Sequence, residues 1–149
     1  MTTSLTYFII SFFIGLVLVA PYLWWLNRLS LNRLNQAAGV GLIVAAIIYI
    51  GFAWFNGNEP WLLVEALGVL LYGLSAWLAW RFSILWLAAG WGLHPLWDVW
   101  VHWLGPGSHI APAWYAIACL SFDFAVAIYI VKRSGLRPLL HHESTGGNN

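Results

Sequence analysis

The chain has 149 residues, of which 62% are hydrophobic and only 7% are charged, and its mean hydropathy is +0.78. These values lie outside the range of soluble globular domains and exclude a water-soluble fold. The formal net charge is +1, and no basic, aromatic-rich pattern indicates a nucleic-acid partner. The sequence therefore predicts an integral membrane protein whose partners are membrane lipids.

Five apolar runs are each long enough to cross a bilayer. In chain order they cover residues 4–25, 37–55, 61–80, 84–104 and 113–131. The longest connection, residues 27–36, is expected to lie on the membrane surface as a short amphipathic segment. Because the other connections are short, the sequence predicts an all-α, antiparallel bundle of five transmembrane helices in one domain, residues 1–133. The polar residues 134–149 are expected to form a flexible cytoplasmic tail.

The basic residues predict an orientation in the membrane. All six follow the first, third or fifth run: Arg28, Arg33, Arg81, Lys132, Arg133 and Arg137. Positively charged connections stay on the cytoplasmic side, so the N-terminus is expected outside and the C-terminus in the cytoplasm. The expected location is a bacterial inner membrane.

Five ionisable side chains lie inside these apolar runs. His94, Asp98 and His102 follow one another at i, i+4 and i+8, which places them on one face of a helix. Glu65 belongs to the third run and Asp123 to the fifth. Ionisable groups are costly in a bilayer, so each of them requires a partner, a bound ion or water.

Depth in the membrane sorts these side chains into two levels. With a rise of about 1.5 Å per residue, Glu65 and Asp98 lie with His102 toward the outer end of the bundle. Asp123 lies with His94, roughly 15 Å deep. All five are expected to converge in the outer half of the bundle, where the three carboxyl groups are the candidate catalytic groups.

Three interpretations of this set stay open. The first is a buried hydrogen-bond network in a non-catalytic assembly or scaffold protein. The second is a divalent metal site with His94, Asp98 and His102 as ligands, since imidazole and carboxylate suit zinc, iron or manganese. A straight helix separates the two imidazoles by roughly 12 Å, so one ion reaches both only if Pro95 bends the helix. The third is metal-free proton transfer, in an enzyme or along an ion pathway.

Aromatic residues near this set indicate a kind of substrate. Tyr72, Trp91 and Trp97 are expected to line an apolar pocket that suits a lipid or isoprenoid-like molecule, and their ring faces can stabilise a cation. The leading prediction is a metal site that supports chemistry on such a substrate. Whether the protein is an enzyme, and in which oligomeric state it works, stays open.

One part of the chain resembles a known family. The stretch Trp91-Gly-Leu-His-Pro-Leu-Trp-Asp98, followed by His102 and by Cys119-Leu-Ser-Phe-Asp123, is similar to a family of small bacterial integral membrane proteins of about this length. The resemblance covers the last three apolar runs and implies the five-span architecture. It implies no activity and no substrate.

Overall fold

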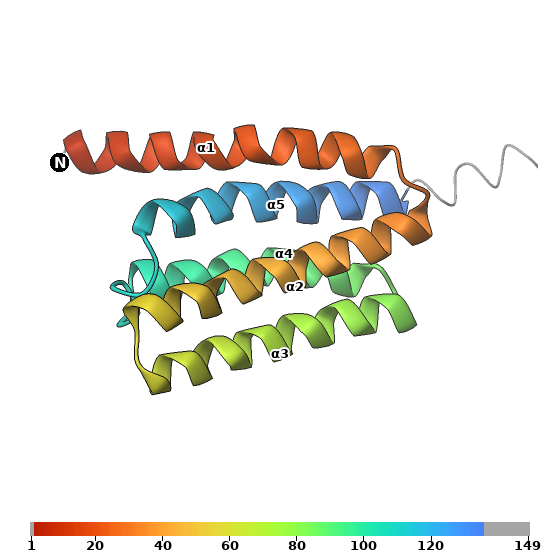
Figure 1. Ribbon diagram of the computed structural model, residues 1–149. Coiled ribbons are helices and arrows are strands. Elements are labelled where there is room, and N and C mark those ends of the chain that lie inside the picture. Colours follow the sequence, from red (N-terminus) through yellow and green to blue (C-terminus); the bar gives the residue numbers. More distant parts are fainter. Residues whose placement is uncertain (1, 136–149) are drawn as a thin grey trace, which may run out of the picture.

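The computed structural model describes residues 2–135, and its helices follow the apolar runs of the sequence. Five α-helices form the bundle (Figure 1): α1 (Thr2–Asn27), α2 (Leu31–Asn56), α3 (Glu59–Arg81), α4 (Leu85–Asp98) and α5 (Ala113–Gly135). A π-helical turn, η1 (Val99–Trp103), continues α4 without a break. Within residues 2–135 there is no strand, and the prediction of an all-helical fold is confirmed.

Four of the five α-helices are long and apolar enough to cross a membrane. They are α1 from Ser4 onward, α2, α3 and α5, with mean hydropathies between 1.8 and 2.2. The fourth helix has only 14 residues, but it runs on into the 5 residues of η1. Such a bundle fits a multi-pass membrane protein.

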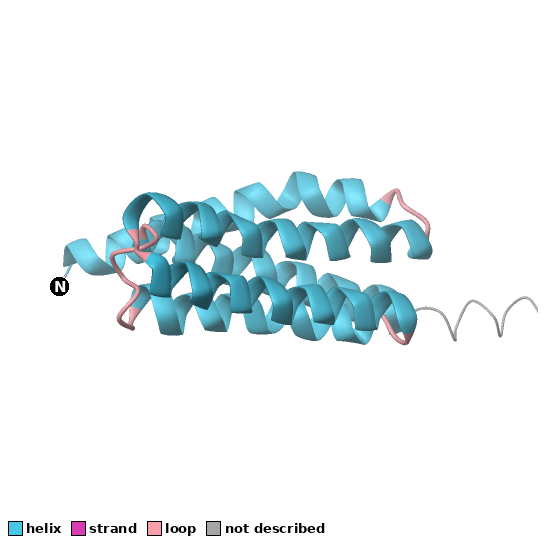
Figure 2. Cartoon of the chain, turned by 60° about the horizontal axis from the view of Figure 1, so that its bottom comes forward, coloured by secondary structure: helices cyan, strands magenta, loops and turns pink. Residues whose placement is uncertain are grey.

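The fourth helix lies between two neighbours in the bundle. It packs against α5 on one side and α3 on the other, while α2 lies along α3. The first helix packs lengthwise against α5 and makes only slight contact with α2. Gly15 permits this close packing, because a Cβ there would collide with the Ala118 carbonyl group of α5. The connecting loops lie at the two ends of the bundle (Figure 2), so the middle of the bundle is helical throughout.

The connection between α1 and α2 is shorter than the sequence predicts. Residues 28–30 alone separate the helices, and the stretch expected on the membrane surface forms the first turns of α2. Asn35 in these turns donates from Nδ2 to the Ala79 carbonyl oxygen at 3.0 Å. In return, Trp80 donates from Nε1 to the Asn35 carbonyl oxygen at 3.1 Å. These bonds hold the polar turns against the end of α3 as part of one continuous helix.

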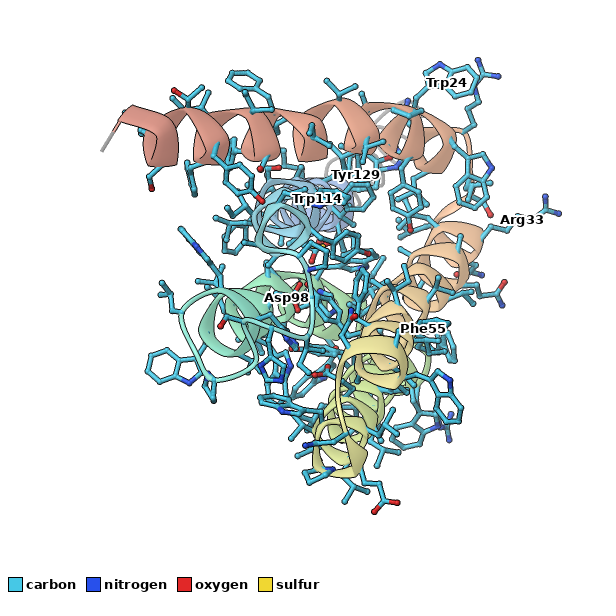
Figure 3. The ribbon with its side chains drawn as sticks, turned by 60° about the vertical axis from the view of Figure 1, so that its left-hand side comes forward. Trp24, Arg33, Phe55, Asp98, Trp114 and Tyr129 are labelled. Atoms are coloured by element: carbon cyan, nitrogen blue, oxygen red, sulfur yellow. The ribbon has the colours of Figure 1, made fainter. Side chains whose placement is uncertain are left out.

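The basic residues that the structure describes gather at one end of the bundle. This is the end where α1, α3 and α5 finish (Figure 1). There Trp24 and Arg33 point away from the bundle (Figure 3), and the Arg28 guanidinium lies 3.7 Å from the centre of the Trp24 ring. The expected tail, residues 134–149, begins inside α5. Its residues 136–149, including Arg137, lie outside the described ones.

Candidate metal centre

Two sets of ionisable side chains lie inside the bundle, and both include a histidine of the segment formed by α4 and η1. The first set, which we call the His94 group, contains His94 and Asp98 of α4 and Asp123 of α5. The second set, the His102 pair, contains His102 of η1 and Glu65 of α3. None of the five residues is more than 2% exposed. The residues singled out in the sequence thus converge inside the bundle, but in two sets.

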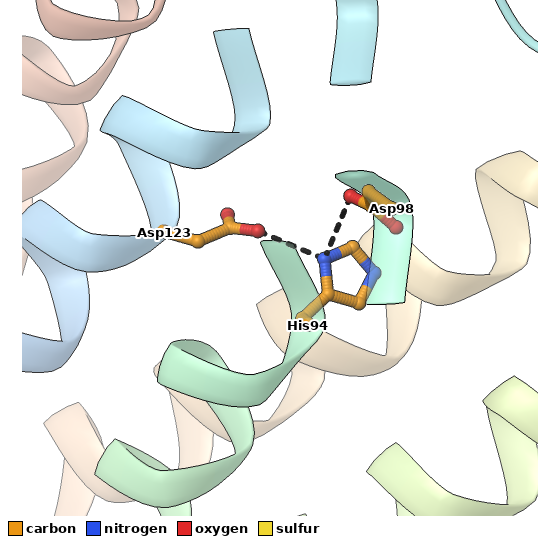
Figure 4. A group of neighbouring side chains, drawn as sticks. All are labelled: His94, Asp98 and Asp123. Carbon is orange, nitrogen blue, oxygen red and sulfur yellow. Dashed lines mark hydrogen bonds and ion pairs between the residues drawn. The ribbon is translucent and has the colours of Figure 1, made fainter. Parts of the chain in front are cut away.

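The His94 group is centred on one imidazole nitrogen. Nδ1 of His94 lies 2.8 Å from Oδ2 of Asp123, at hydrogen-bond distance, and 3.3 Å from Oδ2 of Asp98 (Figure 4). Each of the three side chains offers one ligand atom, and these atoms all lie within 4.8 Å of one another. The His94 group can therefore hold a metal ion.

Asp98 is the member of this group whose bonding is incomplete. Its side chain lies in the interior of the bundle (Figure 3) and is 0% exposed. Among the described residues, neither carboxylate oxygen has a well-aligned hydrogen bond, although His94 and the Tyr49 hydroxyl group both lie within reach of Asp98. A buried ionised carboxylate without compensation costs several kcal/mol. A cation bound between Asp98 and its two neighbours would supply that compensation.

The His102 pair has one carboxyl group for its one imidazole. Nε2 of His102 lies 3.1 Å from Oε1 of Glu65. On the other side of the ring, Nδ1 lies 3.3 Å from the carbonyl oxygen of Gly107, in the loop between η1 and α5. One imidazole and one carboxyl group become neutral together by sharing a proton. The pair can therefore be neutral without an ion, although its two facing atoms, like those of Asp98, make no well-aligned hydrogen bond within residues 2–135.

Tyr49 of α2 contacts both histidines and was not identified from the sequence. Its ring stacks on His102 with 4.6 Å between the ring centres, and meets His94 edge-on at 5.9 Å. The Tyr49 hydroxyl group is buried and lies within reach of Asp98, although it makes no well-aligned hydrogen bond within residues 2–135. Its one signal in the sequence is its position inside an apolar run, away from the membrane interfaces where aromatic residues gather.

The backbone of η1 explains why the two histidines belong to different sets. The sequence favours a bend at Pro95, but α4 continues through that residue, and the departure from α-helical geometry lies at Val99–Trp103. There the Leu104 amide donates to the Val99 carbonyl oxygen, five residues earlier, at 2.9 Å. A π-helical turn contains more residues than an α-helical one. His102 is therefore not stacked directly over Asp98 and points to Glu65 instead.

The three aromatic residues expected in one substrate pocket line two different hollows. Tyr72 and Trp97 belong to an open groove of about 610 Å³ between α3 and α4. Trp91 belongs to a cavity of about 290 Å³ between α1, α2 and α5. Asp123 lies in the wall of this second cavity, so the His94 group has an apolar space beside it.

The fold and the site together define an apolar helical bundle with a buried group of one histidine and two aspartates. Comparison with known proteins adds no relative: no family model, no curated protein and no solved structure matches the chain. The function must therefore be inferred from the chemistry of the site.

Proposed function

We propose that this is a five-span membrane protein that binds one divalent metal ion through His94, Asp98 and Asp123. In this proposal α4 and η1 together form one span, which adds to the four spans formed by α1, α2, α3 and α5. The described basic residues mark the cytoplasmic end of the bundle, as expected for a bacterial inner-membrane protein with its N-terminus outside. The metal site then lies in the outer half of the bundle.

The observation that carries the proposal is the charge imbalance of a fully buried group. With both aspartates ionised and His94 neutral, the group bears two negative charges, which a divalent cation neutralises. Without a cation, a protonated His94 balances one carboxylate, and the other must bind a proton or remain uncompensated. Such a charge is costly inside a protein and more so within a bilayer.

The ligand atoms suit a small group of metals. One imidazole nitrogen with carboxylate oxygens is a donor set typical of zinc, iron(II) and manganese(II). Two ligands of a tetrahedral zinc ion lie about 3.3 Å apart, given metal–ligand distances near 2.0 Å. The atoms of His94 and Asp98 already have this separation, 3.3 Å, and those of Asp123 and His94 need to move apart slightly from 2.8 Å.

Three protein ligands leave at least one coordination position open. Metal sites that perform catalysis keep such a position for water or substrate, whereas structural zinc sites fill all four with protein ligands. A metal bound here can polarise an oxygen atom of a substrate or activate a water molecule. The geometry therefore supports chemistry at the ion in addition to binding.

A metal-free hydrogen-bond network or proton relay is the second candidate. It is favoured by the 2.8 Å distance between His94 and Asp123, which is typical of a charge-assisted hydrogen bond. This candidate accounts for Asp123 directly, but it accounts for Asp98 only if that carboxyl group binds a proton or is bonded by Tyr49. Metal binding accounts for both aspartates.

Elemental analysis of protein purified in detergent without added metal tests the proposal. We expect about one equivalent of a transition metal in the wild type, none in Asp98→Asn and an unchanged amount in Glu65→Gln. The last variant is the matched control, because it alters a buried carboxyl group outside the His94 group. A wild-type content below about a tenth of an equivalent would overturn the proposal.

A further inference from the structure

The two hollows beside the ionisable groups differ in the polar atoms that they offer. In the groove between α3 and α4, the hydroxyl group of Tyr72 donates to the Leu93 carbonyl oxygen at 3.4 Å, and that of Ser75 donates to the Trp86 carbonyl oxygen at 2.6 Å. The cavity between α1, α2 and α5, which we call the α1–α2 cavity, contains Asp123 in its wall. Of these two hollows, only the α1–α2 cavity is lined by a member of the His94 group.

The α1–α2 cavity is elongated along α5. The residues of α5 in its wall come in adjacent pairs one turn apart, from Trp114 and Tyr115 at the start of the helix to Phe122 and Asp123. At about 1.5 Å per residue this wall is roughly 13 Å long. A chain molecule bound there lies parallel to the helices, in the direction that lipid chains take in a bilayer.

The mouth of the α1–α2 cavity is apolar and opens sideways. Leu18 of α1 and Val44 and Ile48 of α2 line it and are 55%, 49% and 40% exposed. The opening exists because α1 packs along α5 and scarcely contacts α2. In a bundle that spans the membrane, this surface faces the hydrocarbon of the bilayer. The occupant must therefore come from the lipid phase.

We infer that the α1–α2 cavity is the entry through which one hydrocarbon chain of a membrane lipid reaches the His94 group. Its volume of about 290 Å³ lies at the lower end of the range for small-molecule sites and suits one chain rather than two. The chain lies against α5 with the lipid's polar end near Trp114, and an interior carbon of the chain lies next to Asp123. This inference rests on the proposed function, since it makes a lipid the substrate of the metal site.

Photo-crosslinking tests the entry. The probe is a long-chain fatty acid with a diazirine in the middle of its chain, and the readout is labelling that excess unlabelled fatty acid competes away. We expect labelled residues in the cavity walls of α1, α2 and α5. Ala45→Phe fills the cavity and is expected to lower this labelling about tenfold. Ala89→Phe, the same change in the groove between α3 and α4, is the matched control and is expected to leave it unchanged.

Ile48→Trp is a second blocking variant, placed at the exposed mouth of the cavity where a large side chain does not disturb the core. Competed labelling along α3 and α4, or labelling that neither blocking variant lowers, would overturn the inference. Metal content is measured on the same samples. Labelled cavity walls in protein without metal would overturn the proposed function alone, whereas bound metal without labelling of the cavity would overturn the entry alone.

Discussion

The His94 group and the His102 pair use the same types of residue in different proportions. Each is built around one imidazole from the segment of α4 and η1, and each is buried. The pair has one carboxyl group for its imidazole, and the ring is also held by the Gly107 carbonyl oxygen. The group has two carboxyl groups for one imidazole.

This difference is the reason that we propose an ion at one of these two similar buried sites and not at the other. A single imidazole can compensate a single carboxylate by accepting its proton, so the His102 pair can be neutral without an ion. The second carboxylate of the His94 group has no second imidazole, so it needs a proton or a cation, and one divalent cation neutralises both carboxylates at once. The number of acids per base, more than the presence of histidine, distinguishes a candidate metal site from a structural pair here.

Asp123→Asn and His102→Leu are expected to differ most, in metal content. Asparagine keeps the size of the side chain but loses the anionic ligand, so we expect the affinity for metal to fall at least about a hundredfold, more than removal of an outer-sphere partner costs. His102→Leu is expected to keep its metal. Elemental analysis and metal titration measure both. Retention of metal in Asp123→Asn together with its loss in His102→Leu would assign the metal to the His102 pair instead of the His94 group.

The next largest effect concerns the stability of the His102 pair. His102→Leu leaves Glu65 buried without compensation, and we expect the free energy of unfolding to fall by about 3–5 kcal/mol. The double variant that also carries Glu65→Leu is expected to recover most of this loss, because no charge remains. Unfolding in detergent measures all three variants. Additive losses in the double variant would show that the two side chains do not act as a pair.

Removal of the metal is expected to destabilise the wild type but not Asp98→Asn. An ion present at about a hundred times its dissociation constant stabilises the folded state by about 2.7 kcal/mol, which a chelator removes. Thermal unfolding with and without chelator measures the change. An equal decrease in both proteins would place the chelated ion outside the His94 group.

Tyr49→Phe is expected to have the smallest effect. The Tyr49 hydroxyl group lies within reach of Asp98 but makes no well-aligned hydrogen bond in the described part of the chain, so its removal is expected to change stability by less than about 1 kcal/mol. Tyr72→Phe is the matched control and is expected to lose about 1 kcal/mol, because that hydroxyl group donates to Leu93. A larger loss in Tyr49→Phe than in Tyr72→Phe would show that Tyr49 links the two sets through its hydroxyl group.

The helices could be predicted because lipid-compatible composition and length leave few alternatives. The start of α2 could not, because its polar first turns read as a surface segment. Their helical state depends on the hydrogen bonds of Asn35 with Ala79 and of Trp80 with Asn35, which join two helices. Such contacts between helices leave no periodic signal in the sequence.

The site could be predicted where it depends on spacing and depth. The i, i+4 spacing brings Asp98 to His94, and equal depth brings Asp123 to the same level. The position of His102 depends on the π-helical turn at Val99–Trp103, which no residue type there specifies. The depth estimate places Asp98 with Glu65, whereas the structure joins it to His94.

X-ray absorption spectroscopy at the edge of the bound metal tests the central claim most directly, because it counts the imidazole ligands of the ion. The proposed site predicts one imidazole nitrogen, with oxygen atoms as the other ligands, at about 2.0–2.2 Å. A smaller number of oxygen neighbours in Asp123→Asn, measured with enough added metal to load the variant, would assign one of those ligands. A spectrum with two imidazoles would assign the ion to His94 and His102 together and would contradict the assignment of His94, Asp98 and Asp123 as its ligands.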